Sequence, residues 1–481
     1  MASGMRCSVG HGGHGRRLAV VLALLASLAS SRRHGASAAA ELEGSGPKWH
    51  VVSARSLLPS TACTAAKAAP DTSAVRVVHR HGPCSPLQAR GHAPSHEEIL
   101  ERDQDRVDSI RRRIAGAPAI SDVARAPEGV SLPAYLGTSA GTTNYIMTVG
   151  LGTPARNLSV EIDTGSDLSW VQCEPCARCY GQQDPLFDPA RSSTYSAVPC
   201  GAPECRELDP QSCAADRECR YEVIYDDYSH ADGTVSRDAL TLAASRTLPS
   251  FVFGCGHDDA GLFGKVDGLF GLGRGKMSLP SQAATKYGAG FSYCLPSSPS
   301  AEGYLAFGVG AAPANTQFTE MARGPETWSY YLNLVGVKVA GREIGIPPAV
   351  FATGGTIIDS GTVITRLPPR AYAALRSAFV RSMASYRRAP ALSLLDTCYN
   401  FTGQTRVKIP SVDLVFAGGT TVNLNARGVL YVSTVSQTCL GFASTGDETS
   451  VNILGNTQQK TFTVVYDVAK QRIGFGAKGC N

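Results

Sequence analysis

Two short phrases in the sequence each place an aspartate at the start of a glycine turn flanked by hydroxyl side chains. They are Asp163-Thr164-Gly165-Ser166 and Asp359-Ser360-Gly361-Thr362, which lie 196 residues apart. Each phrase follows a short run typical of a β-strand, residues 158–162 and 356–358. Because the same order recurs in each half of the chain, we expect two related lobes that each contribute one aspartate to a shared site.

Two carboxylates that share a proton can hydrolyse a peptide bond without a metal or a covalent intermediate. Like charges held about 3 Å apart do not both ionise, so the pair titrates in two separate steps. Between these steps one carboxylate is a base that deprotonates a water molecule, and the other is an acid that polarises the scissile carbonyl. The predicted chemistry needs no cofactor and no metal ion.

The residues around the two aspartates suit the same task. The two glycines allow the turns to approach each other closely. Thr164 and Ser360 are expected to form hydrogen bonds across the junction between the turns. Ser166 and Thr362 are expected to bond the outer carboxylate oxygens and hold each aspartate in plane. The alternative is that both phrases are ordinary β-turns, since Asp and Gly are common turn formers; their repetition favours a catalytic pair.

Further motifs at matching positions in each half extend the pattern. Leu269-Phe270-Gly271 and Ile453-Leu454-Gly455 are apolar-apolar-Gly triplets that follow the first and second aspartate. With these motifs and the run from Asp163 to Cys173, the chain resembles the pepsin-like aspartic endopeptidases, most closely the plant nepenthesin group. The resemblance runs from about residue 144 to the C-terminus. It implies a mostly β, bilobal fold of two duplicated β-lobes, with the active site in the cleft between them.

The resemblance also implies a β-hairpin flap that closes over the substrate. Tyr225 is the expected flap tyrosine, and Trp170 lies where the family places an indole that bonds it; the alternative is that both are core aromatics. Relatives usually have Tyr-Gly-Asp-Gly-Ser here, whereas this chain has Asp226, Asp227 and Tyr228 after the tyrosine. Because Tyr tolerates positive φ poorly, we expect a stiffer flap and a lower or more selective activity.

Composition and the N-terminal region predict an exported, turn-rich β-protein. Hydrophobic residues make up 43% of the chain, with 50 glycines and 28 prolines. A helix is expected around residues 370–383, after a Pro-Pro pair. Residues 1–38 are predicted to be a signal peptide, because two arginines precede an apolar run that is too short to span a bilayer. We expect secretion, to the apoplast if the resemblance holds, with the vacuole or a membrane anchor as alternatives.

Residues 39–134 are predicted to be a pro-segment, followed by an N-terminal catalytic lobe over 135–325 and a C-terminal lobe over 326–481. A charged stretch in the pro-segment begins with Ser95, a plausible helix start. A basic peptide laid across an acidic cleft would inhibit the enzyme until acid weakened the attraction, so the pro-segment is the expected intramolecular inhibitor. The alternative is a linker with a charged helix. Low-complexity sequence over 114–143 is the expected cleavage region.

Cysteine usage supports export. Twelve of the 15 cysteines lie from Cys173 onward, and seven of them crowd into a cysteine-rich insert, 173–219. The spacing Cys-x2-Cys-x2-Cys also fits a zinc site, but in an exported chain disulfides are favoured. Spacing alone does not give the pairs. The resemblance implies Cys173–Cys176, Cys179–Cys255, Cys200–Cys219, Cys205–Cys213, Cys294–Cys480 and Cys398–Cys439.

Charge and partners complete the expectation. The formal net charge is +5, but the excess lies in the first forty residues, and no basic patch with interleaved aromatics suggests nucleic acid binding. Asn157 and Asn400 begin glycosylation sequons. We therefore expect a monomeric, secreted aspartic endopeptidase that is acid-active and cuts protein or peptide substrates near bulky apolar residues. The alternative is a weak or inactive extracellular binding or inhibitor protein on the same fold, which only the altered flap supports. Such relatives typically lose a catalytic aspartate or its glycine, whereas this chain keeps both phrases.

Overall fold

The computed structural model describes residues 48–64, 74–87, 94–115, 135–136, 145–208, 212–214, 216–225, 229–243, 246–308, 312–460, 462–477 and 480. The predicted signal peptide over 1–38 lies outside these residues. So do most of the predicted cleavage region and the flap residues Asp226, Asp227 and Tyr228. Within the described residues, no helix is long and apolar enough to cross a membrane.

The first half of the chain from residue 145 is built mostly from antiparallel strands, with short helices. Its longest pair is β10 with β11, and β4 pairs with β5 along the same sheet. Its strands are β4 (Tyr145–Leu151), β5 (Arg156–Asp163), β6 (Trp170–Gln172), β7 (Ser196–Ala197), β8 (Ser212–Cys213), β9 (Cys219–Ile224), β10 (His230–Ala243), β11 (Arg246–Ala260), β12 (Gly268–Gly271), β13 (Phe291–Cys294) and β14 (Glu302–Phe307), with helices α3 (Pro203–Arg206) and α4 (Leu279–Tyr287).

The second half repeats this mostly β architecture, with one longer helix, α6. The prediction of a helix at 370–383 is confirmed within a residue at each end. The strands are β15 (Gln317–Ala322), β16 (Tyr331–Leu332), β17 (Leu334–Val339), β18 (Arg342–Glu343), β19 (Thr356–Ile358), β20 (Thr365–Leu367), β21 (Arg387–Ala389), β22 (Cys398–Asn400), β23 (Arg406–Pro410), β24 (Val412–Phe416), β25 (Thr421–Leu424), β26 (Leu430–Thr434), β27 (Gln437–Leu440), β28 (Phe442–Ser444), β29 (Asn452–Leu454), β30 (Thr463–Asp467) and β31 (Arg472–Gly476); the helices are α5 (Pro348–Ala352), α6 (Pro369–Ser382), α7 (Ala426–Val429) and α8 (Asn456–Gln459).

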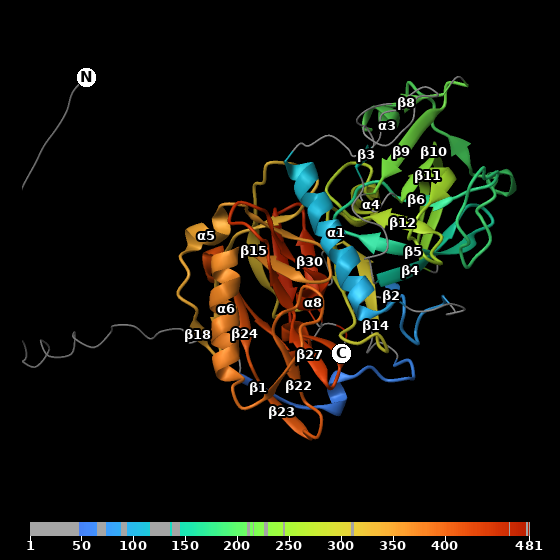
Figure 1. The fold of residues 1–481 in the computed structure, drawn as a ribbon. Helices are drawn as coiled ribbons and strands as arrows, with labels where there is room; N and C mark the ends of the chain where they lie inside the picture. The colour runs from blue at the N-terminus through green and yellow to red at the C-terminus, as the bar shows by residue number, and fades with distance from the viewer. Residues whose placement is uncertain are drawn as a thin grey trace, which may run out of the picture. The chain divides into compact units, whose positions relative to one another are not determined.

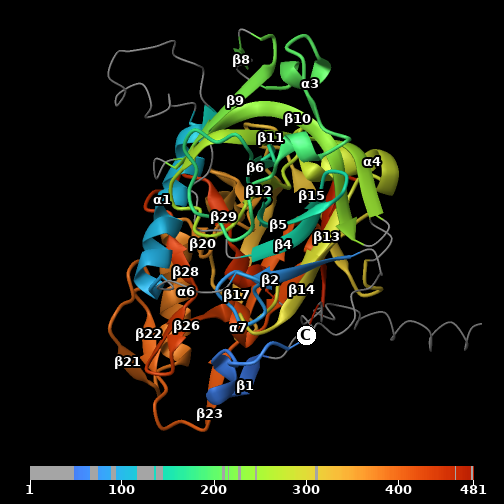
Figure 2. The same cartoon turned by 90° about the vertical axis from the view of Figure 1, so that its right-hand side faces the viewer.

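A shared sheet joins the two halves. β13 of the first half pairs with both β14 and β30, β30 pairs with β31, and β31 pairs with β15. The last strands of the chain therefore lie beside strands that precede them by well over a hundred residues. Figure 2 shows β13 and β14, the strands of the first half at this junction, side by side. The mostly β, two-lobed fold predicted from the sequence is confirmed.

The segment upstream of residue 116 contributes strands to this body as well as a helix. β1 (Trp49–Ser53) pairs with β23, and β2 (Val75–His79) lies between β4 and β14. The helix α1 (His96–Ile114) begins with a complete capping box between Ser95 and Glu98, which confirms the helix start predicted there. Figure 1 shows α1 crossing between strands of the first half and strands of the second. A short strand, β3 (Tyr135–Leu136), pairs with β9.

The disulfides correct four of the pairings that the resemblance implied. Cys294–Cys480 and Cys398–Cys439 are paired as expected. The other eight cysteines after residue 172 have partners that differ from the expected ones. A further disulfide lies in the upstream segment. These other bonds are Cys173–Cys255, Cys176–Cys179, Cys200–Cys213, Cys205–Cys219 and Cys63–Cys84.

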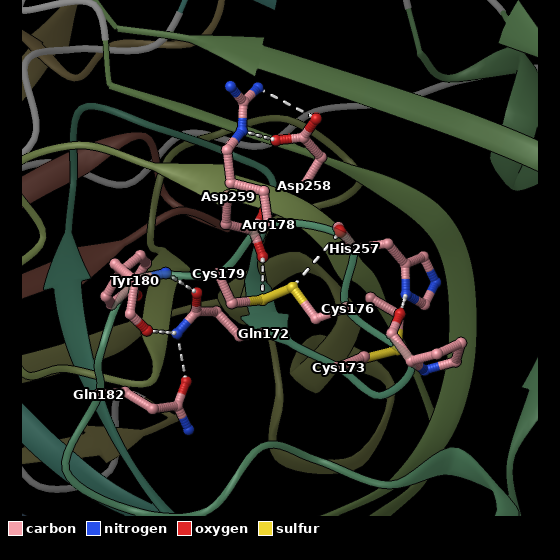
Figure 3. The surroundings of a disulfide bond; sticks show 12 residues. Gln172, Cys173, Cys176, Arg178, Cys179, Tyr180, Gln182, His257, Asp258 and Asp259 are labelled. Carbon is pink, nitrogen blue, oxygen red and sulfur yellow. Dashed lines mark hydrogen bonds and ion pairs between the residues drawn. A yellow bond between two sulfur atoms is a disulfide. The ribbon is translucent and has the colours of Figure 1, made fainter.

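The pairing of the strands explains why Cys173 is bonded to Cys255. β6 runs parallel to β11, and the backbone N–H of Cys173 donates to the carbonyl of Gly256 at 2.8 Å, so Cys173 lies beside Cys255. Figure 3 shows the Cys176–Cys179 disulfide next to Cys173, on a loop that Gln172 holds in place. The side-chain amide of Gln172 both donates to and accepts from the backbone of Tyr180. All three cysteines of the predicted metal-like spacing are thus in disulfides.

Candidate active site

The two aspartate phrases lie at the ends of equivalent strands. β5 ends at Asp163 and runs parallel to β12, which carries the first apolar-apolar-Gly triplet. β19 leads into Asp359 and runs parallel to β29, which carries the second. The backbone N–H of Asp359 donates to the carbonyl of Leu454 at 3.1 Å. The backbone N–H of Leu272, which follows the first triplet, donates to the backbone carbonyl of Asp163 at 2.7 Å. Each triplet strand therefore fixes the position of its aspartate turn through backbone hydrogen bonds.

Hydroxyl groups bind the two turns to each other. The backbone N–H of Thr164 donates to Ser360 Oγ at 3.1 Å, and the N–H of Ser360 donates to Thr164 Oγ1 at 2.8 Å. The two hydroxyl oxygens are 3.3 Å apart. Both side chains are buried, so these bonds are shielded from competition with water. They hold the two aspartates at a fixed separation, as the sequence pattern led us to expect.

Hydrogen bonds also orient the carboxylates, although not symmetrically. Asp359 accepts from the backbone N–H groups of Gly361 and Thr362 and from the Thr362 hydroxyl at 2.6 Å. Asp163 accepts from the N–H of Gly165 at 3.0 Å. The matching expectation for Ser166 is wrong: its Oγ has no hydrogen-bond partner within the described residues. The expected assistance by a hydroxyl of the same turn is therefore seen for Asp359.

An arginine from the upstream helix lies between the two aspartates. Arg106 Nη2 donates to Asp163 Oδ1 at 2.6 Å and to Asp359 Oδ1 at 2.9 Å, and its Nε donates to Asp359 Oδ2 at 2.9 Å. All three side chains are buried. A guanidinium presents its donors as a planar fork, which suits bonds to two carboxylates at once. The space between the two carboxylates is thus filled by a side chain of α1.

The charges of this triad shift the affinity of its groups for protons. Burial raises the pKa of Asp359, but the adjacent Arg106 guanidinium and the hydrogen bonds of Thr362 and Gly361 outweigh it, so the pKa lies below its ordinary value. Burial lowers the pKa of Arg106, and the two carboxylates reverse that effect and raise it above its ordinary value. With α1 docked, the arrangement therefore favours ionised Asp359 and charged Arg106.

A second buried ion pair anchors α1 one turn before Arg106. Asp103 accepts from the backbone N–H groups of Val363 and Ile364, immediately after the second catalytic turn. Its carboxylate also lies 3.0 Å from the Arg366 guanidinium, and both side chains are fully buried. Further along the helix, Arg113 donates to the carbonyl of Gly165 at 3.4 Å. α1 therefore contacts both catalytic turns.

The sequence analysis expected a basic inhibitory peptide but did not identify these residues. The buried face of α1 includes Leu100, Asp103, Arg106, Val107 and Ile110, a stripe at helical spacing. Such a stripe normally holds apolar side chains. The detectable signal was therefore an aspartate and an arginine three residues apart within an otherwise apolar stripe, where each needs a charged partner from elsewhere.

The predicted flap pair is in contact. Trp170 Nε1 donates to the Tyr225 hydroxyl at 2.9 Å, and both side chains are buried. Phe263 packs edge-on against both rings, with centroid distances of 4.9 and 5.4 Å. Tyr225 directly follows β9, and its backbone N–H donates to the carbonyl of Ser229, the residue before β10. The hairpin tip between these residues lies outside the described ranges.

The two sequon asparagines differ in access. Asn157 is exposed on β5. Asn400 is half-buried at the end of β22, and its Oδ1 accepts from the backbone N–H of Thr402 at 2.8 Å. Attachment of a glycan at either position stays a prediction, with Asn157 the more open of the two.

We expect the substitution Gly271→Ala to lower turnover more than it lowers stability. A Cβ at Gly271 would lie 2.4 Å from the carbonyl oxygen of Asp167 and 2.7 Å from that of Ser166, both in the backbone after the first catalytic turn. Because backbone cannot rotate away as a side chain can, the turn must shift, and a shift of about 1 Å can cost about 100-fold in rate. Steady-state kinetics beside thermal unfolding checks this. A kcat equal to that of the parent would contradict it.

Two β-lobes, each ending a strand at an aspartate and cross-bonded through Thr164 and Ser360, define the pepsin-like class of fold. The chain belongs to the plant aspartyl protease family of this class, as its relatives show. An aspartyl protease family protein of Arabidopsis thaliana is 44% identical over 443 residues, covering 90% of this chain and 93% of the relative. Aspartic proteinase nepenthesin-2 of Nepenthes gracilis is 35% identical, covering 77% and 85%.

Family models and solved structures agree with this fold. Residues 145–309 match the model described as xylanase inhibitor N-terminal, and residues 329–477 match its C-terminal counterpart. Among solved structures, basic 7S globulin from soybean is similar with a TM-score of 0.56 and 23% identity, covering 70% of this chain and 92% of that one. Conglutin gamma from lupine seeds has a TM-score of 0.57 and 20% identity, with 70% and 93% coverage. At these identities the two structures speak for the fold alone.

Proposed function

We propose that the protein is a secreted, acid-active aspartic endopeptidase that prefers bulky apolar residues around the cut. The observation that carries the proposal is the pair Asp163 and Asp359, held together by the crossed bonds of Thr164 and Ser360. With Arg106 withdrawn, one carboxylate would deprotonate a water and the other would protonate the peptide carbonyl. The carboxyl group that took the proton from water then gives it to the leaving amine. The two products therefore carry a new carboxyl terminus and a new amino terminus.

We propose further that residues 39–134 keep the enzyme inactive as a zymogen. Arg106 neutralises the dyad charge, and its guanidinium fills the place of the catalytic water. Asp103 and Arg113 fix the same helix on either side. Cleavage between α1 and the first strand of the catalytic body, followed by departure of α1, would expose both carboxylates. The body then corresponds to lobes at 135–325 and 326–481.

The second candidate is an extracellular binding or inhibitor protein with little or no turnover. The description of the matching family models as xylanase inhibitor halves favours it. Against it stand the intact dyad, the cross-bonded turns and an arginine positioned to neutralise them, none of which a binding protein requires. Relatives named as proteases at up to 44% identity also favour the endopeptidase.

The test is cleavage of an unfolded protein at about pH 4 by the acid-treated, processed chain, with and without a statine-containing peptide. Statine mimics the tetrahedral intermediate, so it blocks a carboxylate dyad and leaves other hydrolases unaffected. We expect cleavage that the peptide abolishes. A folded, processed sample that cleaves nothing would overturn the proposal and favour the binding protein.

Release of α1 should be driven by acid. The pKa of Asp359 is lowered while Arg106 is docked, so opening takes up protons and becomes more favourable as pH falls. Burial raises the pKa of Asp103, which acts in the opposite sense and limits the steepness. We expect α1 to become sensitive to an added protease as pH falls from about 5 through 4. Sensitivity that instead increases as pH rises above neutrality would contradict this sign.

A further inference from the structure

We propose that Glu161 forms the floor of a substrate pocket that takes an arginine side chain, and that Arg80 of the upstream segment fills this pocket in the zymogen. The inference rests on the proposed endopeptidase function and adds to it a substrate class for one subsite. It departs there from the expectation of apolar side chains around the cut. The other subsites are not affected.

The position of Glu161 links it to the catalytic cleft. Glu161 precedes Asp163 by two residues on β5, and residues two apart on a strand point to the same face of a sheet. Its directly paired neighbours are Ile146 on β4 and Leu269 on β12. Paired residues share a face, so the carboxylate is flanked by two apolar side chains on the side to which Asp163 points.

That face carries the flap aromatics. Ile146 and Leu269 belong to one buried apolar cluster with Trp170, Tyr225 and Phe263. The residues on either side of Glu161 along β5, Val160 and Ile162, belong instead to the main core on the opposite face. A fully buried glutamate is thus paired on both sides with members of the apolar cluster that contains the expected flap tyrosine.

Arg80 completes the pocket from outside the catalytic body. It follows β2, and its Nη1 donates to Glu161 Oε1 while its Nη2 donates to the carbonyl of Phe263 at 2.7 Å. The side chains of the arginine and the glutamate are 5% and 0% exposed. The guanidinium therefore uses two separate donors on two different acceptors, an arrangement that a single lysine ammonium cannot reproduce with the same geometry.

Departure of the upstream segment would leave this carboxylate without its guanidinium. Loss of an ion-pair partner from a buried charge is strongly unfavourable. Arg80 comes from the same segment as Arg106, so the event that opens the dyad also vacates the pocket. An arginine of a substrate that enters the cleft can then make the same two bonds, and its binding is favoured relative to an apolar side chain of similar length.

The competing possibility is that Arg80 never leaves, because β2 lies between β4 and β14 in the shared sheet. In that case Glu161 is a structural partner of Arg80 and the pocket stays closed. The two possibilities differ in a measurable property, since only an open pocket makes cleavage depend on a basic residue in the substrate.

The experiment uses the processed wild-type chain, Glu161→Leu and the matched control Glu302→Gln on a peptide library. Glu302 also pairs with an upstream arginine, Arg76, at 2.6 Å, but lies on β14 outside the flap cluster. We expect the wild type and the control to prefer Arg over Leu at one subsite by about tenfold or more, and Glu161→Leu to lose this preference while cleaving apolar sequences. Apolar preference at every subsite in the wild type would overturn the inference and leave the endopeptidase function intact.

A binding measurement keeps the inference testable if no cleavage is seen. Statine-containing hexapeptides with Arg or Leu placed at each position in turn are titrated against the same three processed proteins. We expect the wild type and the control to bind one Arg peptide about tenfold more tightly than its Leu counterpart. Glu161→Leu is expected to bind that Arg peptide no more tightly than the Leu peptide. Equal affinity of all Arg and Leu peptides for the wild type would overturn the pocket, whereas binding without turnover would overturn only the proposed activity.

Discussion

The intact chain carrying Arg106→Met is expected to cleave unfolded protein near pH 6, where the unprocessed wild type is silent. The substitution removes three hydrogen bonds and leaves two buried carboxylates facing an apolar side chain. An uncompensated buried charge costs about 3–5 kcal/mol, which strongly weakens the docking of the helix even though Asp103 and Arg113 are among its other anchors. We therefore expect an activity gain of at least about 100-fold over the intact wild type.

The matched control for this variant is Arg102→Met, which removes an arginine one turn earlier on the same helix; the hydrogen bonds described above to the two carboxylates come from Arg106. This control should remain as silent as the wild type. Circular dichroism and thermal unfolding show whether each variant is folded, and binding of a statine-containing peptide reports an open dyad without requiring turnover. A folded Arg106→Met chain that neither cleaves nor binds the peptide until it is acidified would contradict the blocking role of Arg106.

Asp359→Asn is expected to lower kcat of the processed enzyme by about 10³-fold or more. An amide keeps the shape of the carboxylate and can still bond Thr362, but it neither takes a proton from water nor gives one to the peptide carbonyl. Peptide affinity should fall far less than kcat, because the amide still offers polar atoms to the substrate.

Asp413→Asn provides the control for loss of a buried carboxylate in the same half of the chain. Asp413 lies on β24, where it accepts from the side-chain amide of Asn423 and has no role in the dyad. We expect it to retain wild-type kcat. If Asp359→Asn kept more than about a tenth of wild-type kcat while folded, the dyad would not be the catalytic group.

The dyad itself could be predicted because it depends on local sequence that is written twice. A strand, an aspartate, a glycine turn and a later apolar-apolar-Gly triplet each have short-range signatures, and their repetition places them face to face. The bond of Thr362 to Asp359 followed from that symmetry. The failure of Ser166 to make the matching bond did not, because the two turns differ in side-chain orientation, which a four-residue pattern does not encode.

Features that depend on long-range contacts were harder to predict. The partners of Cys173 and Cys179 are decided by the parallel alignment of β6 with β11, and no spacing rule contains that alignment. Arg106 is one of several arginines in a charged helix. Its place in the apolar stripe marks it as buried, but only the docked position of α1 shows that it reaches the two aspartates. Likewise, Glu161 reads as a polar residue in an apolar run until its strand neighbours and Arg80 are known.

The most direct test of the account is the binding of a statine-containing peptide to the intact chain, measured by calorimetry at pH 7 and again immediately after a step to pH 4. The claim under test is that Asp163 and Asp359 form a working dyad, which Arg106 keeps closed in the intact chain. We predict no binding at pH 7 and binding of one peptide per chain at pH 4. Equal binding at both pH values would contradict the closure by Arg106, and no binding at either pH by a folded chain would contradict the dyad itself.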